Sequence, residues 1–212
     1  MTKTTFIRLF FYFFGFFLTA FGVTALIRSR LGAGPWDTVT NNLSALIGIT
    51  LGQASMTVNA CIVLFLLIVN RKSRYIFTVV PIVAIGLFID VWDILILGDL
   101  FLSNFFLQLL FFALGVFFIT SGLAIVIVTG FPAMIFDELT FTLMRLIKSE
   151  SFFKVRLFVE FFAITLAIIL GFLASIGFGA VNVGSILLAL TIGPLINYQI
   201  HLVRNLMRLK TA

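Results

Sequence analysis

Six hydrophobic runs, each close to the length that an α-helix needs to cross a bilayer, alternate with short polar stretches along the chain. They predict membrane-spanning helices at about residues 6–28, 52–70, 75–97, 104–128, 155–174 and 180–202. The chain has 212 residues, of which 62% are hydrophobic and 10% charged, whereas soluble domains carry roughly 25% charged residues. The expected fold is therefore an all-α, polytopic membrane protein.

Two shorter segments, at about residues 35–48 and 132–147, are amphipathic rather than uniformly apolar. Each begins with a proline, Pro35 or Pro132, which suits the first position of a helix because the N–H of that position makes no bond within the helix. Both segments are too polar to face lipid along their whole length. We therefore expect two short broken or re-entrant helices in addition to the six spans.

The basic residues indicate the orientation of the chain. With six spans, 12 of the 14 Lys and Arg residues fall on the side that holds both termini, and only Arg28 and Arg30 fall on the other. Cytoplasmic loops of membrane proteins carry such an excess of positive charge. We therefore expect a protein of the bacterial cytoplasmic membrane, with the N- and C-termini in the cytoplasm.

A self-similarity at an offset of one hundred residues divides the chain into two halves, 1–100 and 101–212. Each half contains three spans and one short helix, so an odd number of crossings places the second half upside down relative to the first. This pattern predicts two inverted repeats, the plan of many secondary transporters. The aligned pairs are Gly15 with Gly115, Gly22 with Gly122 and Asp37 with Asp137, followed after small length differences by Asn59 with Glu160.

The motif Leu31-Gly32-Ala33-Gly34-Pro35-Trp36-Asp37 and the closing Ile192-Gly193-Pro194-Leu195 make the chain similar to a known family. It resembles the YczE branch of the YczE/YyaS/YitT membrane proteins of bacteria over almost its whole length. The resemblance implies a small multi-pass membrane protein, and transport has been suggested for some members. The second motif, at residues 130–137, departs from the family's usual GxGPxD form, which puts a ligand contact by its backbone in doubt.

Ionisable and polar residues at membrane depth are the candidates for a binding site, because burying such groups in lipid is costly. Carboxylates at the starts of both short helices favour a cation, a proton or an amine over an anion. Structural roles compete with this interpretation, since Asp37 and Asp137 suit a helix N-terminus and Glu160 lies four residues after Arg156. The candidates for solute or ion binding are Trp36, Asp37, Asn41, Asn59, Asp137, Glu138 and Glu160.

The side-chain inventory narrows the function. One cysteine and one histidine argue against the common metal sites and catalytic pairs, so we expect no metal, no cofactor and no enzyme activity. The net charge of +6 lies at helix ends and suits lipid headgroups rather than nucleic acid. The sequence therefore favours a secondary transporter or permease for a small solute. A non-transporting scaffold or regulatory partner of other membrane proteins is the alternative, and the oligomeric state is left open.

Overall fold

The computed structural model describes residues 3–131 and 135–207. All regular secondary structure in this part of the chain is helical. Six helical segments are long and apolar enough to cross a membrane, as the hydropathy pattern predicts. Each differs from its expected range by a few residues. The spans are α1 (Lys3–Ser29), α3 (Leu51–Asn70), a composite of η1 (Ser73–Thr78), α4 (Val79–Asp90) and the π-helix η2 (Val91–Ile96), then α5 (Phe105–Thr129), α7 (Phe152–Leu173) and α8 (Val183–Met207).

The two short segments also form helices, α2 (Pro35–Ile47) and α6 (Phe136–Ile147). Pro35 occupies the first turn of α2, and the helix ends at Gly48, whose left-handed φ of 70° lets its N–H bond the Ser44 carbonyl. The second helix begins at Phe136, four residues later than expected. Pro132, its expected first residue, lies outside the described residues.

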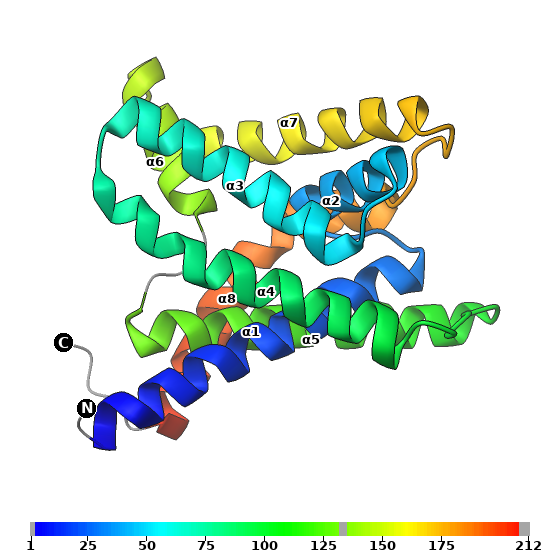
Figure 1. The fold of residues 1–212 in the computed structure, drawn as a ribbon, viewed down its shortest axis with the longest axis horizontal. Helices are drawn as coiled ribbons and strands as arrows, with labels where there is room; N and C mark the ends of the chain where they lie inside the picture. Colours follow the sequence, from blue (N-terminus) through cyan, green and yellow to red (C-terminus); the bar gives the residue numbers. More distant parts are fainter. Residues whose placement is uncertain (1–2, 132–134, 208–212) are drawn as a thin grey trace.

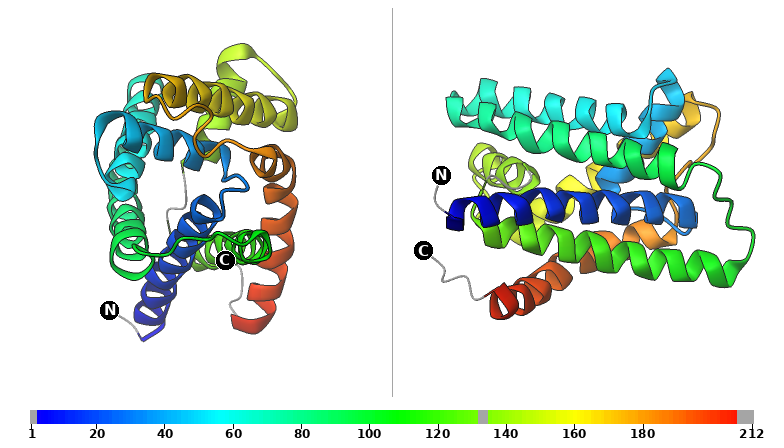
Figure 2. Two further views of the ribbon diagram at one scale, coloured as in Figure 1. Left: turned by 90° about the vertical axis from the view of Figure 1, so that its right-hand side faces the viewer. Right: turned by 60° about the horizontal axis from the view of Figure 1, so that its bottom comes forward.

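The long helices run between two ends of the molecule (Figure 1). We call the end at which α1 begins and α8 ends the terminal end, and the opposite one the far end. Seen end on, α3 and α4 stand on one side and α8 on the other, with α7 above and α1 and α5 below (Figure 2). The helix α2 turns back at the far end, between α1 and α3, whereas α6 turns back at the terminal end, between α5 and α7.

Glycines bring α1 and α5 into backbone contact, and this is the most extensive helix pairing in the described chain. A Cβ on Gly15 would lie 2.8 Å from the Gly122 carbonyl oxygen, and one on Gly22 would lie 2.8 Å from that of Gly115. Larger side chains would force the helices apart. Gly15 and Gly22 therefore permit the close approach of the two helices.

A buried asparagine fastens α2 to α7 and to the loop that follows it. Asn42 is fully buried, and its Nδ2 donates to the carbonyl oxygens of Ala167 (2.8 Å) and Phe178 (3.2 Å). Its Oδ1 accepts from the backbone N–H of Ala180 at 3.1 Å. The Asn42 side chain thus holds α2 against α7 and the following loop through three hydrogen bonds.

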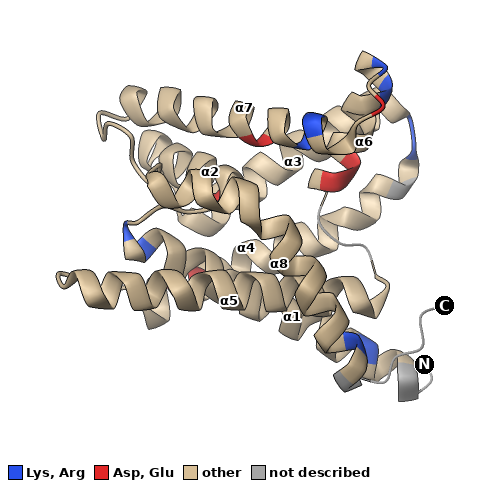
Figure 3. Ribbon diagram, turned by 180° about the vertical axis from the view of Figure 1, so that it is seen from behind, with Lys and Arg blue, Asp and Glu red and all other residues tan. Residues whose placement is uncertain are grey.

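Charged residues gather toward the ends of the helices (Figure 3). At the far end, Arg28 forms a 2.7 Å ion pair with Asp93 and also donates to the Gly98 carbonyl. Asp90 accepts from the Thr50 hydroxyl and the Gly52 N–H, both at 2.7 Å, and so ties the start of α3 to α4. These two acids have structural partners and hold the far end of the bundle together.

Candidate functional site

A cavity of about 100 Å³ lies where the helices meet, and we call it the central cavity. Each of the eight α-helices in the described chain contributes at least one residue to its wall. Taken in helix order from α1 to α8, examples are Val23, Asp37, Asn59, Ile89, Ile119, Phe136, Glu160 and Ile192. The wall therefore draws on helices from the beginning to the end of the chain.

The first turn of α2 supplies one polar wall of the central cavity. Asp37 follows Pro35 and Trp36 there, and the backbone of Gly34 donates to its carboxylate. No Lys, Arg or His among the described residues forms an ion pair with Asp37. Burial first, and then the negative charge of Glu160, raise the pKa of Asp37 to about 7, with the Gly34 hydrogen bond acting in the opposite direction. This carboxyl can therefore exchange a proton near neutral pH.

Arg156 and Glu160, both on α7, also line the cavity, and Arg156 is in turn paired with Asp137 on α6. Arg156 Nε lies 2.7 Å from Glu160 Oε1, and Arg156 Nη1 lies 2.7 Å from Asp137 Oδ1. The Glu160 side chain is 4% exposed, whereas that of Asp137 is 65% exposed. The ion pairs therefore lead from the buried wall of the cavity outward to the surface of α6.

Two aromatic rings, one from each short helix, line the cavity. The indole of Trp36 stacks on the ring of Phe136, with centroids 5.2 Å apart and an interplanar angle of 29°. Trp36 Nε1 is buried and has no hydrogen-bond partner in the structure. An indole N–H normally finds an acceptor when it is buried, so this donor is available to a bound molecule.

An amide on α3 and a hydroxyl on α2 also line the cavity. Asn59 donates from Nδ2 to the Ser55 carbonyl at 2.8 Å, which leaves its Oδ1 as a possible acceptor for a guest. Thr40, one turn along α2 from Trp36, also lines the cavity and donates to the Trp36 carbonyl. Carboxylate, amide and hydroxyl oxygens therefore converge on one small space.

The structure gathers four of the predicted site residues, Trp36, Asp37, Asn59 and Glu160, around the central cavity. Asp137 does not line the cavity, but it is ion-paired with Arg156, which does. Glu138 points elsewhere and accepts from the Tyr75 hydroxyl at 3.0 Å. The two aligned aspartates are thus not brought together, because the start of α6 presents Phe136 to the cavity instead of its acid.

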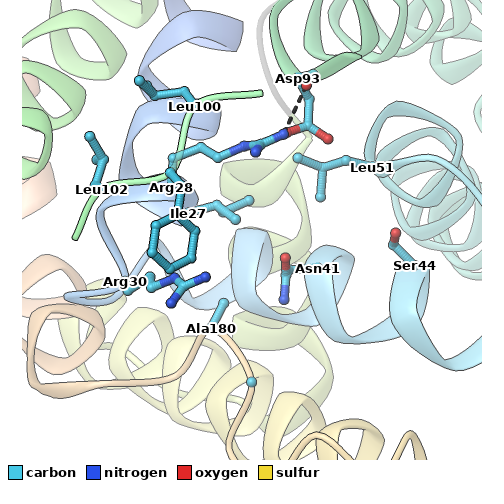
Figure 4. Close-up of a pocket in the computed structure, with 12 residues that line it drawn as sticks. Ile27, Arg28, Arg30, Asn41, Ser44, Leu51, Asp93, Leu100, Leu102 and Ala180 are labelled. Carbon is cyan, nitrogen blue, oxygen red and sulfur yellow. Dashed lines mark hydrogen bonds and ion pairs between the residues drawn. The ribbon is translucent and has the colours of Figure 1, made fainter. Parts of the chain in front are cut away.

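Asn41 lines a separate pocket at the far end, which we call the end pocket (Figure 4). This pocket has a volume of about 550 Å³ and includes Arg28, Arg30, Ser44 and Asp93. The helix α2 connects the two spaces, since its first turns line the central cavity and its later turns line the end pocket.

Sequence reasoning did not select Arg156 or Phe136 as site residues. Arg156 was explained by its spacing to Glu160, and that ion pair is present, but the same guanidinium also holds Asp137. A signal for Phe136 was available, because it stands one hundred residues after Trp36, the same offset that relates Asp37 to Asp137. Spacing alone could not show that these two rings touch.

Comparisons with known proteins agree with a membrane protein. A family of unknown function, DUF6198, matches residues 6–201. The chain is 28% identical over 169 residues to the uncharacterized protein YyaS of Bacillus subtilis, covering 80% of this chain and 83% of that protein. It is 33% identical over 134 residues to the uncharacterized membrane protein YczE of the same organism, covering 63% and 61%. No solved structure matches the chain at a significant level.

Proposed function

This chain belongs to the DUF6198 family, and we propose that it is a secondary transporter that carries a small solute by alternating access around the central cavity. The observation that carries the proposal is the cavity itself, which all eight α-helices line and which holds Asp37 without a cationic partner among the described residues. We place the protein in the bacterial cytoplasmic membrane, with both termini in the cytoplasm, as the distribution of basic residues indicates.

Helix contacts support a twofold arrangement of the two halves. In the pairing of α1 with α5, Gly15 faces Gly122 and Gly22 faces Gly115, so equivalent glycines exchange places across the interface. A twofold axis produces this kind of reciprocal contact. Other contacts are reciprocal as well, since α1 packs on α4 as α5 packs on α8, and α2 packs on α7 as α6 packs on α3.

The short helices support inverted halves, because they turn back at opposite ends of the molecule. Their first turns meet at the stacked rings of Trp36 and Phe136. In such folds, half-helix ends that meet near the midplane form the substrate site, and the halves rock around it. We assign that role to the central cavity.

The two sides of the cavity differ, which suggests how access could alternate. Toward the far end, α2 leads to the end pocket of about 550 Å³. The Asp137–Arg156–Glu160 ion pairs join α6 to α7 beside the cavity. In our proposal these ion pairs hold the cytoplasmic path closed in this conformation, and their separation opens it. The end pocket is then the vestibule on the outer side.

Thiol labelling tests alternating access without knowledge of the substrate. In a Cys61→Ser background, Ser55→Cys places the sole thiol on the cavity wall. Thr57→Cys places it on the outer face of the same membrane-spanning helix, where lipid shields it from a water-soluble reagent. Right-side-out and inside-out vesicles are treated with a membrane-impermeant cationic methanethiosulfonate reagent. We expect labelling of Ser55→Cys from both sides and of Thr57→Cys from neither. Access from one side only, or from neither, would contradict transport and favour a scaffolding role.

A further inference from the structure

The charges around the central cavity determine which kind of guest it can hold. Asp37 and Glu160 are carboxylates in its wall, and Arg156 is the one basic residue among the described residues that line it. Two nitrogens of Arg156 are already engaged, Nε by Glu160 and Nη1 by Asp137. The guanidinium is therefore committed to protein acids, while Asp37 has no cationic partner in the described chain. The Asp37 carboxylate can therefore attract a positively charged ligand into the cavity.

The aromatic rings distinguish an organic cation from a metal ion. Trp36 and Phe136 both line the cavity beside these acids, and aromatic faces attract ammonium groups. Bare cations such as Ca²⁺ instead need six or more oxygen ligands. No three His, Cys, Asp or Glu side chains come together around one point in the part of the chain that the structure describes. The wall is thus suited to a nitrogen cation that carries alkyl groups.

A second feature of the guest follows from the indole N–H. Trp36 Nε1 is buried without a partner, so a complementary guest carries a hydrogen-bond acceptor. Space limits its size. A cavity of about 100 Å³ corresponds to roughly seven water positions, at about 15 Å³ each, and hence to a molecule with about as many non-hydrogen atoms.

We infer that the central cavity binds a small organic ammonium ion that carries a hydroxyl or other acceptor, of the size of ethanolamine or choline. The charged nitrogen lies against Asp37 and the Trp36–Phe136 pair, and the acceptor meets the indole N–H. This inference rests on the proposed function only in treating the cavity as the substrate site, and binding can be measured without transport.

A fluorescence titration tests the inference directly. The chain has two tryptophans, so Trp92→Phe leaves Trp36 as the single reporter in the cavity wall. The purified variant in nanodiscs is titrated with choline, with ethanolamine and with 3,3-dimethylbutan-1-ol, the neutral isostere of choline. We expect a saturable change with choline and an affinity for the neutral alcohol lower by about tenfold or more. Equal affinities, or no saturable binding of choline or ethanolamine, would overturn the inference.

Charge variants provide the second arm. Asp37→Asn is expected to weaken choline binding by about tenfold or more, and Asp99→Asn, on an exposed acid outside the cavity, is expected to leave it unchanged. Glu160→Gln and the exposed Glu150→Gln form a second matched pair. If Asp37→Asn does not fold, the relative affinities for choline and its neutral isostere still test whether the cavity binds an ammonium ion. Choline binding together with one-sided thiol labelling would support this inference and contradict transport. Two-sided labelling without binding of choline or ethanolamine would support transport and contradict this inference.

Discussion

Trp36 at the start of α2 and Phe136 at the start of α6 stack on each other, with ring centroids 5.2 Å apart. The two residues stand one hundred positions apart, which is the offset of the self-similarity in the sequence. Each short helix enters from a different end of the molecule, and the rings are where they meet. This contact joins α2 to α6 at the wall of the central cavity.

The stacked pair is expected to couple the two short helices energetically. Trp36→Ala and Phe136→Ala, made singly and together, should show a coupling energy of about 0.5–1.5 kcal/mol, which is typical of aromatic pairs. The measurement is the free energy of unfolding in mixed micelles. The control is the same cycle with Trp36→Ala and Phe153→Ala, because Phe153 is exposed and makes no ring contact with Trp36. The effects of these two changes should add. Strict additivity in the first cycle would show that the rings do not interact.

Close packing of α1 on α5 predicts a sharp dependence on side-chain size at Gly22. A Cβ there would lie 2.5 Å from the backbone nitrogen of Ile119, so Gly22→Ala should lower the free energy of unfolding by about 1–3 kcal/mol. Gly193→Ala in α8 is the control, because nothing lies within 4 Å of its Cβ position. A loss at Gly22 no larger than that at Gly193 would mean that the interface between α1 and α5 is not closely packed.

The ion pairs of Arg156 predict a rescue. Arg156→Gln leaves the buried Glu160 carboxylate without its cation and should lower the free energy of unfolding by about 3 kcal/mol. Adding Glu160→Gln removes the stranded charge and should recover most of this loss. Lys154→Gln, an exposed change on the same helix, should stay within about 0.5 kcal/mol of the wild type. If the double variant is less stable than Arg156→Gln alone, the carboxylate does not depend on this arginine.

Proton competition at Asp37 predicts a pH dependence of choline binding. The pKa of Asp37 is raised to about 7, so the carboxyl is mostly charged at pH 8 and mostly neutral at pH 6. Because only the charged form attracts the ammonium, affinity should fall about tenfold between those pH values. Glu160, Arg156 and Asp137 also act on the cavity, so Asp37→Asn is the necessary comparison. Its residual binding should not change with pH, and a fall of the same size there would assign the dependence to another group.

Hydropathy predicted the six spans, because a lipid-facing helix needs an unbroken apolar run of fixed length. The short helix at 35–47 was equally predictable, since Pro35 and Gly48 mark its ends in the sequence. The start of the second short helix was predicted less well, because Pro132 precedes Phe136 by four residues and helix α6 begins at the later position.

The contacts between distant helices were beyond the reach of sequence patterns. Asn42, for example, is buried and donates to the carbonyl oxygens of Ala167 and Phe178, which lie on and after α7. Arg156 paired with Glu160 as its spacing predicted, yet its bond to Asp137 depends on how α6 crosses α7. Periodicity assigns a residue to a face of its own helix, and tertiary packing decides what that face meets.

Counterflow in proteoliposomes tests most directly that the central cavity binds and carries a small solute. Vesicles loaded with unlabelled choline are diluted into labelled choline, and its entry is followed for the wild type, Asp37→Asn and Asp99→Asn. We predict that the wild type and Asp99→Asn accumulate label above protein-free vesicles and that Asp37→Asn does not. Absence of accumulation by the wild type, or equal accumulation by Asp37→Asn, would contradict the account.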